Sequence, residues 1–332
     1  WFFLIGILLV GYAILDGFDL GVGALHLFVK DDTDRRIMIN SIGPVWDGNE
    51  VWLVTGGGAL FAAFPHVYAT VFSGFYSALM MLLFMLIFRA VAIEFRSKQQ
   101  MKWWRQMWDV AFSIASIFIA FLAGVAVANL ITGIPLGPDK EFIGTFWGLI
   151  NPYTVLVGVT TVALFMMHGA IYGVMKTEGN LQNKLRSWVN NTIIFFIICY
   201  ITTTMATLIY YPHMIKHFKE FPALFVLAIL NMLAIANIPR EISKRKEFLA
   251  FLSSCASIAA LLSLFAFGLF PNFVLASNNP EYSLNIYNAA SSQKTLNIML
   301  IIALIGIPFV LAYTISIYWI FRGKVKLNNM SY

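Results

Sequence analysis

Charged residues are scarce in this sequence. Only 11% of its 332 residues are charged, 60% are hydrophobic, and the mean hydropathy is +0.78. Soluble domains carry about 25% charged residues. The deficit excludes an ordinary soluble domain and predicts a polytopic membrane protein whose surface mostly meets lipid or other apolar protein. The net charge of +6 does not by itself indicate a nucleic-acid partner, and we expect none.

Cysteine and the motifs of soluble enzymes are also scarce. Cys199 and Cys255 lie far apart in apolar runs, so we expect two free, buried thiols. The sequence contains no Walker motif, no dinucleotide fingerprint and no nucleophile elbow. No cleavable signal peptide is evident, and we expect a short N-terminal piece before Trp1 because the sequence does not begin with Met.

Long apolar runs are abundant, and each needs about 20 residues to cross a bilayer. Transmembrane β-strands alternate in polarity, whereas these runs are continuously apolar, so the predicted fold class is all-α. We predict about nine spans within a single membrane domain over residues 1–332. They cover residues 2–28, 42–64, 67–93, 108–132, 147–175, 189–210, 222–239, 248–270 and 295–320. The longest connection, residues 270–294, is predicted to form an ordered extracellular cap or a contact surface.

The basic residues divide unequally between the two sets of loops. Cytoplasmic loops of membrane proteins are enriched in Lys and Arg, which predicts an outside N-terminus and a cytoplasmic C-terminus here. Outer loops would hold only Lys140, Lys216, Lys219 and Lys294. Inner loops would hold Lys30, Arg35, Arg36, Arg96, Lys98, Lys102, Arg105, Lys176, Lys184, Arg186, Arg240, Lys244, Arg245, Lys246, Arg322, Lys324 and Lys326.

Four carboxylates stand within or at the mouth of the first two spans. Asp16 and Asp19 are three residues apart, as are Asp47 and Glu50, so each pair shares a helix face. A carboxylate at such a depth is costly and commonly faces protein, a partner or a water path. The four residues therefore indicate either helix packing and capping or a water-lined proton path from the cytoplasm.

Arg89 needs an anionic partner because it lies inside the third predicted span. At a rise of 1.5 Å per residue, Arg89 lies about 8 Å from the inner boundary and Asp47 about 9 Å. This matched depth predicts an Arg89–Asp47 pair. Asp19 and Glu50 would then remain free to titrate.

Histidines are few, and their pattern gives no convincing haem or metal site. His168 is the only one deep in a span, where a packed or hydrogen-bonded role is the more common one. His213 and His217 are four residues apart, as metal ligands can be, but no third ligand is obvious. We therefore predict no metal site on this chain.

Several segments, in order, resemble subunit II of the cytochrome bd quinol oxidases. The resemblance covers essentially the whole chain and is densest before residue 110. Its motifs are DGFDLGVG (residues 16–23), RRIMINSI (35–42), WDGN (46–49), GGALFAA (57–63), FSGFY (72–76), FRSK (95–98), WRQMWD (104–109) and ASSQKTLN (290–297).

This resemblance implies a respiratory terminal oxidase of a prokaryotic plasma membrane that oxidises quinol and reduces dioxygen to water. It implies a partner, subunit I, that carries haems b and d and the quinol-oxidising loop, sometimes with small accessory subunits. In the family, the residue matching Asp47 is assigned to a proton path, which we extend to Asp19, Glu50 and Asp16. Residues matching Trp46 and Arg89 lie near a quinone that occupies this subunit in some members.

Two other functions share these features. A proton-coupled secondary transporter would also carry intramembrane carboxylates, but it would function without a partner. A scaffold subunit without a proton role would tolerate replacement of Asp47 with no loss of turnover.

Overall fold

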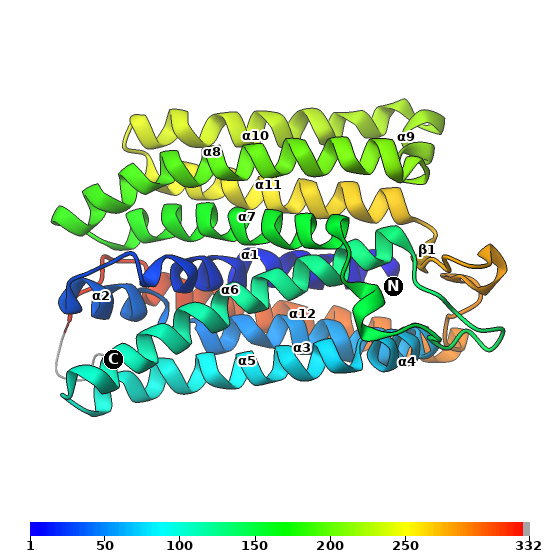
Figure 1. The fold of residues 1–332 in the computed structure, drawn as a ribbon, viewed down its shortest axis with the longest axis horizontal. Coiled ribbons are helices and arrows are strands. Elements are labelled where there is room, and N and C mark those ends of the chain that lie inside the picture. Colours follow the sequence, from blue (N-terminus) through cyan, green and yellow to red (C-terminus); the bar gives the residue numbers. More distant parts are fainter. Residues whose placement is uncertain (328–332) are drawn as a thin grey trace.

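The computed structural model describes residues 1–327 as a bundle of long helices that run side by side (Figure 1). The N-terminus and the end of the described chain lie at opposite ends of the bundle. The α-helices are α1 (Phe2–His26), α2 (Asp32–Ile42), α3 (Trp46–Ala63), α4 (Pro65–Gly74), α5 (Tyr76–Phe95), α6 (Lys102–Thr132), α7 (Pro152–Lys176), α8 (Gly179–Tyr210), α9 (Lys216–Glu220), α10 (Phe225–Ser243), α11 (Glu247–Leu269) and α12 (Gln293–Ile320).

Helix α1 is the centre of the bundle. It packs against α3, α6, α7 and α11. In Figure 1 it lies between a group formed by α7, α8, α10 and α11 and a group formed by α3, α5 and α12. Glycine allows the closest of these contacts. A Cβ on Gly21 would lie 1.8 Å from the Phe165 carbonyl oxygen, and one on Gly169 would lie 2.4 Å from the Gly21 carbonyl carbon. The α1 and α7 backbones therefore touch.

The all-α, polytopic prediction is confirmed. Within residues 1–327, eight helices are long and apolar enough to cross a membrane, namely α1, α5, α6, α7, α8, α10, α11 and α12. The predicted span at residues 42–64 is also a helix, α3, but it has only 18 residues. Its carboxylates and glycines reduce its apolar character below that of the other eight.

The helix boundaries differ from the predicted spans where polar residues extend or divide a helix. Residues 32–42 form α2 rather than a loop, because the Asp31 side chain accepts hydrogen bonds from the backbone N–H groups of Thr33 and Asp34. The predicted span 67–93 is divided into α4 and α5 at Phe75. Helices α6 and α8 begin at residues 102 and 179, well before the predicted 108 and 189.

The end of the bundle that holds the N-terminus is covered by two long connections. Residues 270–292 contain the antiparallel strands β1 (Asn272–Val274) and β2 (Leu284–Asn285). A backbone bridge between Ile134 and Ala276 joins them to the connection between α6 and α7. Their apolar side chains pack on Phe64 and Val67. The predicted ordered segment is therefore present, as a small second core at this end.

Candidate functional site: two buried charge clusters

Arg89 joins three helices through buried carboxylates. Its Nη2 lies 2.5 Å from Asp16 Oδ1 and 3.9 Å from Asp19 Oδ2, and its Nη1 lies 3.0 Å from Glu50 Oε1. Asp16 and Asp19 come from α1, Glu50 from α3 and Arg89 from α5. Arg89, Asp16 and Asp19 are fully buried, whereas the Glu50 side chain is 22% exposed. We call these four residues the Arg89 cluster.

Asn49 extends the Arg89 cluster to α12. Its Nδ2 donates to Asp19 Oδ2 at 2.7 Å and to the Leu15 carbonyl at 3.1 Å. Its Oδ1 accepts from the Tyr318 hydroxyl at 2.9 Å. One amide thus orients a buried carboxylate and fixes the last turns of α12 against α1 and α3.

The Arg89 cluster holds more acid than base. Asp16, Asp19 and Glu50 surround a single guanidinium. Within the described chain, Asp16 Oδ2, Asp19 Oδ1 and Arg89 Nε are buried without a hydrogen-bond partner. Burying unpaired negative charge is costly, so the excess of carboxyls over cations marks this cluster as a candidate functional site.

The predicted Arg89–Asp47 pair is wrong. Asp47 is exposed in the first turn of α3, beside exposed Gly48, and Arg89 reaches Glu50 one turn further along instead. Matched depth does not fix the direction in which a side chain points around the helix axis, and on α3 that direction turns Asp47 outward. Asp19 and Glu50 are consequently not left free, because both lie close to Arg89.

Asp47 does not cap α3 through its side chain. The N-cap residue is Val45, and no side chain there makes a capping hydrogen bond. As an acidic residue in the first turn, Asp47 still interacts favourably with the helix dipole. It lies on an outward face of α3 that continues through exposed Val51, Thr55 and Gly58. Trp46 points the other way, into the main core with Ala92 and Ile93.

A second cluster, which the sequence analysis missed, centres on Asp109 of α6. Its Oδ1 lies 2.5 Å from both His26 Nε2 and Arg96 Nε, and its Oδ2 lies 2.9 Å from Arg35 Nη1. Arg96 Nη2 also contacts Asp32 at 2.8 Å, and Asp32 in turn holds Arg105 at 2.7 Å. We call these six residues the Asp109 cluster; it joins α1, α2, α6 and the segment after α5.

A signal for the Asp109 cluster was present in the sequence. Arg35, Arg96 and Arg105 are among the inner-loop basic residues that predict the orientation. Asp109 stands among aromatic residues at the start of an apolar run. A carboxylate there needs cationic partners, and the basic residues of the inner loops were the candidates.

His168, His213 and His217 each have hydrogen-bond partners within the chain. His168 has both ring nitrogens engaged, by Ser254 Oγ at 2.7 Å and the Ile14 carbonyl at 2.9 Å. His213 bonds the Ile131 carbonyl, and His217 bonds Glu220 and the Phe270 carbonyl. Residues 1–327 contain no group of three His, Cys, Asp or Glu side chains placed to hold a metal ion. A haem iron would have no free, accessible imidazole to bind at His168.

Comparison with known proteins gives a consistent result over the whole chain. The family model described as cytochrome bd terminal oxidase subunit II matches residues 1–321. The chain is 35% identical to cytochrome bd-I ubiquinol oxidase subunit 2 of Escherichia coli K12 over 361 residues, covering 99% of this chain and 95% of that one. It is 36% identical to cytochrome bd ubiquinol oxidase subunit 2 of Bacillus subtilis 168 over 329 residues, covering 98% and 96%.

A solved structure has the same fold. A chain of the bd oxidase from Geobacillus thermodenitrificans superposes with a TM-score of 0.77 over 96% of each chain. The sequences of the two chains are only 14% identical, so this likeness concerns the fold alone.

Proposed function

Because this chain belongs to the cytochrome bd terminal oxidase subunit II family, we propose that it supplies protons from the cytoplasm to the oxygen-reducing centre of the complex. It is a multi-pass subunit of a terminal oxidase in a prokaryotic plasma membrane. The family implies a partner subunit I and haems in the complex. We place the haems b and d and the quinol-oxidising site on that partner.

One observation carries the proton role: the Arg89 cluster gathers two buried carboxyls and one partly exposed carboxyl around one guanidinium. Oxygen reduction consumes protons, and hydrocarbon does not conduct them. A cluster with spare carboxyl oxygens can accept a proton and release it without leaving the membrane interior with an unpaired anion. Apolar residues would stabilise the packing of these helices as well or better, because a buried ion pair adds little net stability.

The order in which the carboxyl groups would pass a proton follows from how exposed each side chain is. Asp47 is exposed, Glu50 one turn deeper is partly exposed, and Asp19 and Asp16 are fully buried. Asp47 would take a proton from water, Glu50 would receive it, and Asp19 and Asp16 would hold it near Arg89. Asn49 keeps Asp19 oriented throughout.

The direction of this path depends on which end faces the cytoplasm. We propose that it is the end with α2 and the Asp109 cluster, because basic residues gather there and α12 ends there (Figure 1). Cysteine labelling from each side of sealed vesicles tests this orientation. Labelling of Lys244→Cys from the outside would overturn it.

A quinone near Trp46 and Arg89 stays a prediction. Both side chains are buried, Trp46 with 8% exposure and Arg89 with none. The guanidinium is already engaged by carboxylates. A quinone headgroup would therefore meet the outward face of α3 before it reached Arg89.

Asp47→Asn in the intact complex tests the proton role. The variant keeps the shape of the side chain and removes its titrating proton. We expect slower quinol-dependent oxygen consumption with an unchanged reduced-minus-oxidised haem spectrum, since we place the haems on the partner subunit. Wild-type turnover across pH 6–9 would favour the scaffold function instead, and loss of haem would indicate an assembly role.

A further inference from the structure

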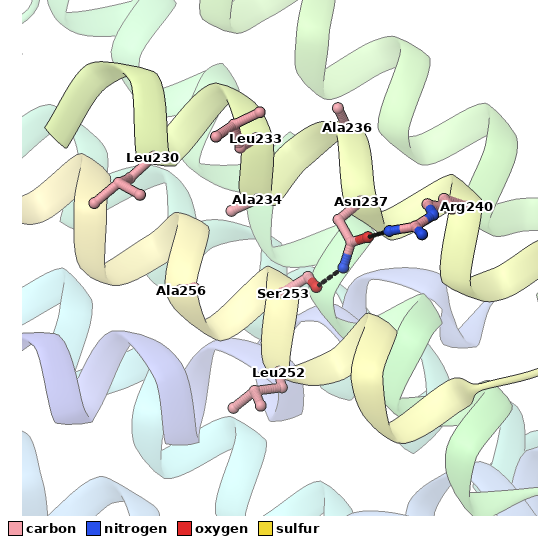
Figure 2. Close-up of a pocket in the computed structure, with 9 residues that line it drawn as sticks. All are labelled: Leu230, Leu233, Ala234, Ala236, Asn237, Arg240, Leu252, Ser253 and Ala256. Carbon is pink, nitrogen blue, oxygen red and sulfur yellow. Dashed lines mark hydrogen bonds between the residues drawn. The ribbon is translucent and has the colours of Figure 1, made fainter. Parts of the chain in front are cut away.

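A groove between α10 and α11 combines an apolar channel with a cationic end (Figure 2). It has a volume of about 580 Å³, and none of the residues that line it belongs to either charge cluster. Small side chains, Ala234 and Ala256, leave the space open, and exposed Leu233 and Leu252 border it. The surface is therefore hollowed where two membrane helices meet, at a place where lipid is the surrounding solvent.

The polar end of the groove is held in place by hydrogen bonds. Asn237 Nδ2 donates to Ser253 Oγ at 2.9 Å, which joins α10 to α11. Arg240 Nη1 donates to Asn237 Oδ1 at 3.2 Å. Figure 2 shows the three side chains in line, with the guanidinium outermost.

Arg240 retains most of its hydrogen-bonding capacity. Its side chain is 65% exposed, and its only other neighbour among the described residues is the Glu241 carboxylate at 3.8 Å. A guanidinium has five N–H donors in a planar fork that suits phosphate. Four of these donors are thus available at the mouth of the groove.

The level of Arg240 and the surrounding charge identify the ligand. Arg240 is three residues before the end of α10 at Ser243, about 4.5 Å along the helix axis, and a long basic side chain near the end of a membrane helix reaches the headgroup level. Exposed Lys244, Arg245 and Lys246 follow directly, whereas Glu247 is already paired with Arg186. The local field is therefore positive and favours an anionic headgroup over a zwitterionic one.

We propose that this groove is a binding site for one anionic diacyl phospholipid. The phosphate accepts hydrogen bonds from Arg240, and the basic turn after α10 adds attraction. One acyl chain lies over Ala234 and Ala256, between Leu233 and Leu252. A transmembrane helix of another protein fits less well, because it would cover the guanidinium without supplying the phosphate oxygens that the free donors require.

The test uses the intact oxidase complex after removal of lipid by detergent. Native mass spectrometry during titration with phosphatidylglycerol or phosphatidylcholine measures how much of each lipid binds. We expect one site that prefers phosphatidylglycerol. Arg240→Gln should weaken phosphatidylglycerol binding at that site about fivefold or more, and Ala256→Leu should weaken binding of both lipids by filling the floor of the groove.

Arg322→Gln is the matched control, because Arg322 is also exposed at the end of a membrane helix but lies over the Trp319 ring. It should leave the site unchanged. If Arg322→Gln weakened phosphatidylglycerol binding as much as Arg240→Gln, or if Ala256→Leu had no effect, the lipid would be attracted by general surface charge rather than bound in the groove. Either result would overturn the proposal. A single-span polypeptide that copurifies and crosslinks at Ala256 would overturn it as well.

Discussion

Arg89 shows what residue-level reasoning from the sequence can and cannot find. That a buried arginine requires a carboxylate, and that α3 supplies one, followed from charge and depth. Which carboxylate it contacts did not, because depth estimated from 1.5 Å per residue carries no information on helical phase. Asp16, Glu50 and Asp19 face Arg89, and Asp47 faces outward.

Replacement of Arg89 is expected to destabilise the subunit strongly. Arg89→Leu would leave three carboxyls buried without a cation, at a cost of about 3–5 kcal/mol. Arg89→Lys keeps the positive charge and loses only the planar, two-pronged hydrogen-bonding geometry of the guanidinium, so its loss of stability should be smaller. Thermal denaturation of the detergent-solubilised complex compares the two. Equal melting temperatures for Arg89→Leu and wild type would contradict this account.

Asp109 is the residue whose importance the sequence analysis overlooked. It accepts from His26, Arg35 and Arg96 at once. Asp109→Asn would remove the only carboxylate that contacts His26 in the described chain, and would leave Arg96 with Asp32 alone. We expect a loss of about 3–5 kcal/mol, seen as a lower yield and melting temperature of the complex. Asp139→Asn, at an exposed carboxylate in a connection, is the control and should have no effect.

At the scale of elements, the apolar middle of each helix was predictable and the ends were not. Hydropathy detects the part of a helix that lipid surrounds. It does not detect the polar turns that precede it, such as residues 102–107 of α6 or 179–188 of α8. Those turns are helical because they continue a helix that is already nucleated. Likewise α2 has a capped start but too few apolar residues to be predicted as a span.

The α1–α7 contact gives a prediction at this scale. Gly21→Ala would place a methyl group about where the Phe165 carbonyl lies, with 1.8 Å between Cβ and oxygen. The helices must separate, and the Arg89 cluster on α1 should be disturbed, so we expect little assembled complex. Gly6→Ala lies on the same helix with no atom within 4 Å of the added Cβ. This control should assemble normally, with at most a slight gain in helix stability. Normal assembly of Gly21→Ala would refute the close approach.

At the scale of the whole molecule, chain topology agrees with the predicted number of crossings. An odd number of spans places the two ends of a chain on opposite sides, and Figure 1 shows them at opposite ends of the bundle. Within residues 1–327, eight helices satisfy length and composition, and α3 runs alongside them in Figure 1. Its weaker apolar character has a reason, because it carries Asn49 and Glu50, which contact the buried charges, and the outward-facing Asp47.

The surface of the bundle indicates that this subunit does not act alone. No residue of α12 is buried within the described chain. The helix is held mainly at its two ends, where Trp1 Nε1 donates to the Leu296 carbonyl and the Tyr318 hydroxyl donates to Asn49. The outward face of α3 beside it exposes Asp47. An exposed carboxylate at that position is costly against lipid but not against a protein partner or a water path.

We therefore expect the chain to form a stable complex with the haem-bearing subunit I. Purification through a tag on this chain should recover subunit I in a one-to-one ratio together with haem, measured by gel densitometry and by the reduced-minus-oxidised spectrum. The same chain expressed without subunit I should carry no stoichiometric haem, because His168 has both ring nitrogens bound within the chain. Stoichiometric haem on the isolated chain would place a cofactor site here and overturn the division of labour between the subunits. Proton transport by the isolated chain in vesicles would favour the transporter function, because a path that serves only oxygen reduction ends at the partner.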